Sequence, residues 1–164
     1  NLHATNSLQE WFVQDISFPK ETVLQFIEFI SHFLRIYPLW LCPLKPGKND
    51  KLSPAYADTD LVIDVGIWGS IDKSKDFIET NREIEKIAKK LGGRKVLYAH
   101  AYYTPEEFWG IYDLNWYNGL RTKYHAEDVF SDVYEKTHVS GTYKKSILKG
   151  LLSVIKSPFK LPVS

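Results

Sequence analysis

The chain has 164 residues, of which 44% are hydrophobic and 15% aromatic, enough to bury the core of one domain. Its formal net charge is +1, yet residues 136–164 contain six lysines and no acidic residue, so an acidic body carries a basic end. Because nucleic-acid binding needs a basic face across the domain itself, this distribution argues against a nucleic-acid partner.

The numbers of cysteine, histidine and methionine residues exclude further kinds of protein. The single cysteine, Cys42, excludes an internal disulfide and fits a reducing compartment, and it lies in an apolar run that is typical of a buried core. The five histidines form no pair with metal-binding spacing, so we expect no metal site. No apolar stretch approaches the roughly 20 residues that cross a bilayer. We therefore expect a cytoplasmic protein, and the absence of methionine predicts a preceding part that this sequence lacks.

Hydrophobic periodicity predicts alternating strands and helices in the first two thirds of the chain. Pro19 suits the first turn of one helix, and Asp72 suits the N-cap of a second helix that Gly92 and Gly93 end. The predicted order is strand 10–18, helix 19–34, buried strand 37–44, strand 61–68, helix 72–91 and strand 95–103. This β-α-β-β-α-β order favours an α+β fold of the ferredoxin-like type, an antiparallel sheet with both helices on one face.

Smaller motifs complete the organisation. Thr104, Pro105 and Glu107 form the signature of a capping box, so the acidic residues there are interpreted as structural. A short helix is expected over 114–124. Gly66-x-x-Gly69 lacks the third glycine of a dinucleotide-binding loop and is interpreted as a turn. We divide the chain into a linker or disordered remnant (1–9), one domain (10–137) and a basic tail (138–164).

One cluster in the last predicted strand carries candidate chemistry. If residues 95–103 are extended, Tyr98, His100 and Tyr102 lie on the same face, so that three proton-carrying groups share one wall. Such a wall is either a polar patch on an open sheet or, where another domain covers it, the lining of a pocket. In the second case a histidine or tyrosine can supply a proton.

Two basic segments follow. Arg121 and Lys123 lie either on a solvated helix face or against an anionic partner, for which the arginine fork is suited. Residues 143–157 form an amphipathic pattern with lysines opposite an apolar arc. This tail is expected either to dock on protein or to lie at an anionic membrane surface, peripheral to the bilayer.

Several short segments, in the same order along the chain, resemble segments of the Δ24-sterol reductases, a family of FAD-dependent oxidoreductases of the vanillyl-alcohol-oxidase type. The segments are Trp11-Phe12-Val13-Gln14-Asp15, Tyr37-Pro38-Leu39-Trp40-Leu41-Cys42-Pro43, Asp64-Val65-Gly66-Ile67-Trp68-Gly69, Leu97-Tyr98-Ala99 and Glu106-Glu107-Phe108-Trp109. Matches at Leu120-Arg121, Lys123, Asp128-Val129-Phe130 and Val133-Tyr134-Glu135-Lys136 extend the resemblance to the family's C-terminal end.

The resemblance implies a division of labour. An FAD-binding domain upstream holds the flavin, NADPH reduces it, and hydride passes to a side-chain alkene of a sterol or isoprenoid lipid. This chain then supplies the substrate-side wall, with Tyr98, His100 and Tyr102 as candidates for the catalytic wall and the proton source. Arg121 and Lys123 become candidates for flavin contacts. The alternative hypothesis is a non-catalytic module whose sheet holds a hydrophobic ligand or a protein partner.

Overall fold

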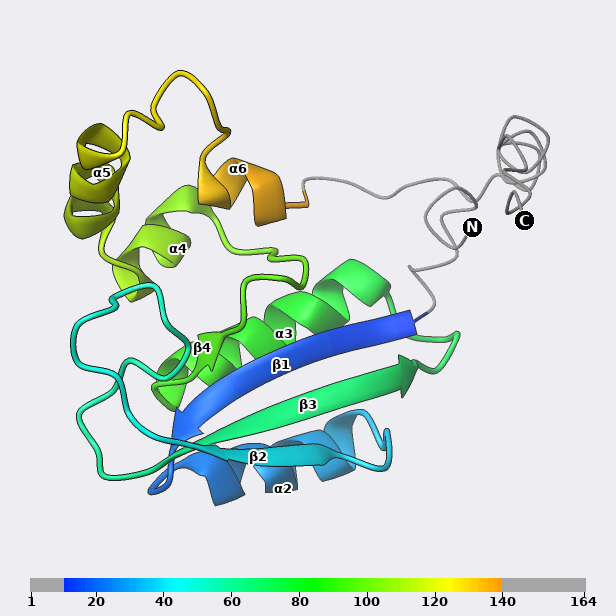
Figure 1. Cartoon of the computed structure of the whole chain (residues 1–164). Coiled ribbons are helices and arrows are strands. Elements are labelled where there is room, and N and C mark those ends of the chain that lie inside the picture. Colours follow the sequence, from blue (N-terminus) through cyan, green and yellow to red (C-terminus); the bar gives the residue numbers. More distant parts are fainter. Residues whose placement is uncertain (1–10, 140–164) are drawn as a thin grey trace, which may run out of the picture.

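A computed structural model describes residues 11–139, which form a four-stranded antiparallel sheet with five helices (Figure 1). The strands lie in the order β2-β3-β1-β4. In chain order the elements are β1 (Trp11–Pro19), α2 (Val23–Phe33), β2 (Trp40–Leu44), β3 (Val62–Ser70), α3 (Phe77–Lys90), β4 (Arg94–Lys95), α4 (Pro105–Ile111), α5 (Leu114–Lys123) and α6 (Val133–Thr137). The expected α+β class is confirmed.

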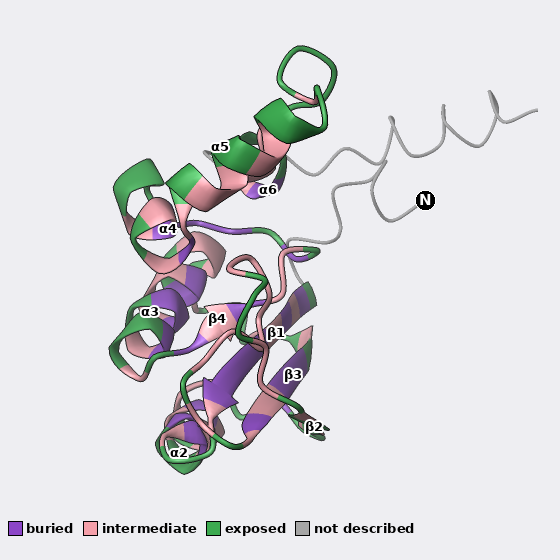
Figure 2. Ribbon diagram, turned by 60° about the vertical axis from the view of Figure 1, so that its left-hand side comes forward, coloured by how far each residue is buried: buried purple, intermediate pink, exposed green. Residues whose placement is uncertain are grey.

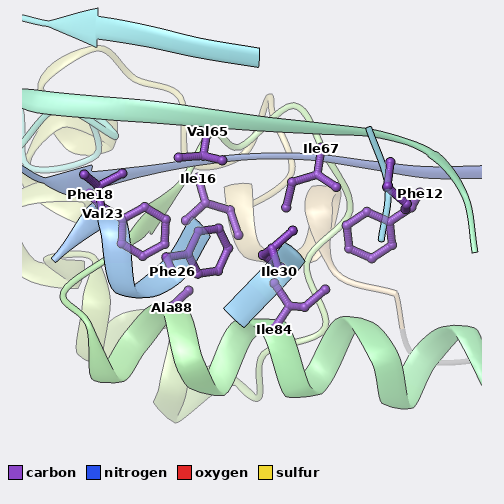
Figure 3. Close-up of a cluster of buried hydrophobic side chains, with 11 residues drawn as sticks. Phe12, Ile16, Phe18, Val23, Phe26, Ile30, Val65, Ile67, Ile84 and Ala88 are labelled. Carbon is purple, nitrogen blue, oxygen red and sulfur yellow. The ribbon is translucent and has the colours of Figure 1, made fainter. Parts of the chain in front are cut away.

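The main core lies between one face of the sheet and the helices α2 and α3 (Figure 3). Alternation along β1 directs Phe12, Ile16 and Phe18 to this face, where all three are fully buried. The ring of Phe18 stacks on Phe26 of α2, with their centroids 4.2 Å apart. Ile84 and other apolar side chains of α3 complete the layer. One face of the sheet is therefore covered by helices, as the sequence predicted.

Several predicted boundaries are wrong by a few residues. Pro19 is the last residue of β1 and not the first of a helix, since its carbonyl accepts from the backbone N–H of Thr22 in a turn that precedes α2. Asp76 caps α3 by accepting from the N–H of Glu79, whereas Asp72 caps only a preceding turn through Ser74. Helix α2 thus begins without a side-chain cap, and α3 is capped by a residue four positions beyond the predicted one. Local signals identify the element but not its first residue.

Two strand predictions fail for long-range reasons. The segment predicted as a buried strand becomes β2, which lies at the edge of the sheet with its residues exposed or half-buried, and Cys42 is half-buried. The strand predicted over 95–103 ends at Lys95 as the two-residue β4. Beyond it, the N–H of Ala99 bonds to the carbonyl of Val96 in a turn, and Ala101 pairs with residues 137–139. Partners outside the sheet therefore take the hydrogen bonds that a longer β4 would need.

The helices α4, α5 and α6 form a smaller second layer. The predicted capping box at the start of α4 is confirmed, because Thr104 and Glu107 exchange side-chain and backbone hydrogen bonds. Phe108, Tyr103 and Tyr112 make its buried core. Helix α5 has no buried residue and is exposed or half-buried along its length (Figure 2). The tail predicted over 143–157 lies outside the described residues.

Candidate functional site

The candidate site is the face of the sheet turned away from α2 and α3, here called the open face. Strand alternation and register bring its side chains together from three strands: Trp11, Asp15 and Ser17 of β1, Asp64, Gly66 and Trp68 of β3, and Trp40 and Cys42 of β2. Tyr98, from the turn after β4, reaches it as well. Three tryptophans and this tyrosine are each at least half exposed, from Trp11 at 51% to Trp40 at 72%. The open face is thus an aromatic surface with carboxylates in it.

Asp15 is the centre of this arrangement. Its Oδ1 accepts from the Trp68 indole N–H at 3.3 Å, and its Oδ2 accepts from the Tyr98 hydroxyl. Gly66 pairs with Asp15 across the strands, and a Cβ at that glycine would lie 2.5 Å from Oδ1. The missing side chain gives the carboxylate its room. Gly66 and Gly69 both lie inside β3, so the predicted turn at this motif is wrong.

Burial raises the pKa of two groups on this face, Tyr98 and Asp64. Burial, and then the hydrogen bond to Asp15, raise the pKa of the Tyr98 hydroxyl well above its ordinary value. Burial also raises the pKa of Asp64, although the Ser17 hydroxyl, which donates to its Oδ1 at 2.7 Å, opposes the shift. The Tyr98 phenol is therefore protonated across the neutral range.

A buried polar network fixes the segment that carries Tyr98. The Lys95 ammonium donates to Glu85 Oε1 at 2.8 Å and to the carbonyl of His100 at 2.6 Å, and both charged side chains are 1% exposed. Glu85 Oε1 also accepts from the N–H of Tyr102 at 2.8 Å. Gln14 of β1 adds a bond to the same His100 carbonyl. The turn that presents Tyr98 is thus anchored to β1, β4 and α3.

The three residues predicted to share one wall are separated. Tyr98 lies on the open face, whereas Tyr102 is buried, with its ring packed edge-on against Phe77 of α3. His100 is exposed, and its carbonyl points into the network on the helix side. The single-wall prediction is wrong because simple alternation requires a strand, and the chain turns at residues 97–99 instead.

Arg121 and Lys123 lie near the end of α5, away from the sheet. The Arg121 guanidinium donates to the carbonyls of Glu127, Phe130 and Ser131 and lies over the Tyr117 ring. Lys123 is exposed beside the ring of Tyr124. The observed role of Arg121 is to hold the loop that follows α5, and the predicted flavin contact of this pair stays a prediction.

Sequence reasoning missed Asp15, Trp40 and Trp68 as site residues. The alternation of Trp11, Val13 and Asp15 was visible, but which strand faces them depends on the register, and the sequence alone does not fix that register. Within residues 11–139 no group of histidine, cysteine and acidic side chains is arranged to hold a metal ion. No helix of the same range is long and apolar enough to cross a membrane.

Comparisons with known proteins identify relatives of this domain. The chain is 33% identical over 131 residues to the Δ24-sterol reductase of Homo sapiens, a match that covers 78% of this chain and 25% of that protein. A homologue of this reductase from Caenorhabditis elegans is 29% identical over 134 residues, covering 79% and 25%. The enzyme of Arabidopsis thaliana is 25% identical over 154 residues, covering 82% and 28%. No family model matches, and no solved structure matches.

These matches relate the chain to the sterol reductases and confirm the resemblance that its short sequence segments indicated. The chain is homologous to a segment of the Δ24-sterol reductases. It spans about a quarter of the length of the relatives it matches.

Proposed function

We propose that this chain is the substrate-side domain of an FAD-dependent oxidoreductase that reduces a side-chain carbon–carbon double bond in a sterol or isoprenoid lipid. The flavin lies in a domain beyond this chain, NADPH is the reductant, and the fragment alone is inactive. The observation that carries the proposal is the open face, in a segment homologous to the Δ24-sterol reductases. An exposed aromatic surface suits an apolar substrate.

The fold also supports a substrate-side domain that works with a separate flavin domain. The strand order β2-β3-β1-β4, with α2 and α3 on one face, agrees with our proposal of a ferredoxin-like domain whose other face is left for a partner. Among the predicted site residues, Tyr98 is the candidate proton source on that face. The aromatic side chains from the three strands would form the apolar wall.

Full-length protein tests the chemistry directly. We expect its absorption spectrum to show bound flavin, NADPH to bleach it under anaerobic conditions, and a sterol with a Δ24 double bond to restore the oxidised spectrum. Trp68→Ala should weaken reoxidation by the sterol while leaving the bleaching by NADPH unchanged. A full-length protein without flavin would refute the oxidoreductase and favour the binding-module alternative.

We further propose that the FAD-binding domain covers the open face. Cys42, the single cysteine of this chain, lies on that face and reports its accessibility. In native full-length protein, peptide mapping after maleimide treatment should find Cys42 protected, and partial unfolding in urea should expose it. Rapid labelling of Cys42 in the native protein would contradict coverage.

The membrane role of the tail 143–157 is a separate proposal, supported by its lysine-rich amphipathic pattern. Flotation of full-length protein with anionic vesicles should fall when residues 141–164 are removed. Equal flotation of the two proteins would remove the proposal and leave the other parts of the function intact.

A further inference from the structure

We propose that Asp15 is a positioning residue of the proposed site, whose carboxylate holds the Tyr98 hydroxyl and the Trp68 indole in fixed places on the open face. The inference rests on the proposed function and adds a residue to it. It also has a consequence that can be measured without turnover.

Geometry gives Asp15 a distinct oxygen for each partner. Oδ1 faces the Trp68 N–H, Oδ2 faces the Tyr98 hydroxyl, and the partners come from β3 and from the turn after β4. A half-buried carboxylate such as Asp15 can still rotate, but here a donor occupies each oxygen. Gly66 leaves the space in which the carboxylate lies, because any side chain there would meet Oδ1 at 2.5 Å. Two aromatic side chains from separate segments are thereby tied to one point on β1.

The negative charge of Asp15 affects the ionisation of Tyr98, which can be measured. The charged groups that act on the Tyr98 hydroxyl from the neighbouring strands are Asp15 of β1 and Asp64 of β3, and both are acidic. Loss of the phenolic proton would place a third negative charge beside them. The closer of the two, Asp15, also accepts the hydrogen bond, so its removal should make Tyr98 easier to ionise.

The first experiment measures that ionisation in full-length protein. The tyrosinate absorbance of Tyr98 is obtained as the difference between a protein and its Tyr98→Phe variant, in the Asp15 and in the Asp15→Asn background. Because burial of the Tyr98 hydroxyl is unchanged by the substitution and only the contribution of Asp15 is lost, Tyr98 should ionise at a lower pH in the Asp15→Asn protein than beside Asp15. The control is Asp60→Asn, which removes an exposed carboxylate paired with Lys20 and should leave the ionisation of Tyr98 unchanged. Equal ionisation with and without Asp15 overturns the inference.

The second experiment asks whether the contact serves turnover. We expect Asp15→Asn to lower kcat/KM by about tenfold in the parent and by about threefold or less in the Tyr98→Phe background, because residues that share a contact couple. Gly66→Ala should reproduce the larger loss without changing any ionisable group. Losses that simply multiply would refute the positioning role while wild-type turnover upholds the proposed function. A wild-type protein inactive on alkenes would refute that function, and the titration would still decide the contact.

Discussion

The buried pair of Glu85 and Lys95 should be the most sensitive polar contact in the described domain. Replacing Glu85 with glutamine leaves the Lys95 ammonium, which is 1% exposed, without its counter-charge. Removing one partner of a buried ion pair costs about 3–5 kcal/mol, because the remaining charge is stranded away from water. The glutamine amide can still accept one hydrogen bond, so we expect Glu85→Gln to lower the free energy of unfolding by about 3 kcal/mol.

Removing both charges should cost less than removing one. In the Glu85→Leu/Lys95→Met double variant neither charge of the pair remains, and the Tyr102 N–H loses its partner. The His100 carbonyl keeps its bond from Gln14, and Arg82 keeps its bond to Glu107. An unsatisfied buried donor costs about 1–3 kcal/mol. The double variant should therefore be at least as stable as Glu85→Gln.

Urea unfolding at neutral pH, followed by circular dichroism, measures these differences. The same helix offers a matched control in the exposed pair of Glu83 and Lys86, whose nitrogen and oxygen lie 3.5 Å apart. Glu83→Gln should change stability by less than about 1 kcal/mol, as surface ion pairs do. The reasoning is refuted if Glu85→Gln costs as little as Glu83→Gln, or if the double variant is clearly the least stable of the set.

Three further predictions follow from other contacts. The guanidinium that Glu107 binds on α3 lowers the Glu107 pKa to about 2, below its unfolded value, so this stabilisation is present above about pH 4.5 and lost toward pH 2. The stabilities of wild type and Glu107→Gln should therefore converge on acidification in urea titrations. Gly110 and Gly119 lie in helices with no atom within 4 Å of an added Cβ, so alanine at each should raise the melting temperature by stabilising the protein by about 0.5–1 kcal/mol. The Arg121 guanidinium reaches the three carbonyls from two nitrogens of a rigid fork, whereas lysine has a single nitrogen, so limited proteolysis of Arg121→Lys should cleave the loop 124–131 faster, and unchanged cleavage would contradict the holding role.

Local signals in the sequence predicted local structure well. The capping box of α4 was correct because Thr104 and Glu107 are three residues apart and meet whenever the helix forms. Hydrophobic periodicity also predicted the helices α2 and α3, since the helical period places their apolar residues on one face, which packs in the core. Both interactions need no knowledge of the rest of the chain.

Contacts between distant residues explain what could not be predicted. Asp15 and Tyr98 are separated by 83 positions, and they meet only because β1 lies beside β4 and the chain turns after Lys95. The turn itself depends on Glu85, which lies on α3 and satisfies the Tyr102 N–H in place of a neighbouring strand. Alternation along the sequence does not indicate that Glu85 will bind the Tyr102 N–H. The predicted strand therefore continued through Tyr98 and placed His100 and Tyr102 on the same face as Tyr98, which is wrong.

The two faces of the sheet differ in what covers them. The helix side already contains a complete core, so the fold does not require aromatic side chains on the other side. Tryptophan and tyrosine bury about 150–250 Å² each when covered, yet Trp11, Trp40, Trp68 and Tyr98 remain at least half exposed. Two of these side chains, Trp68 and Tyr98, donate to the Asp15 carboxylate. A group of exposed aromatic side chains is unfavourable in water and adds little to folding. Its physical rationale is therefore a ligand or a covering domain, and the open face is where the function of this chain should be sought.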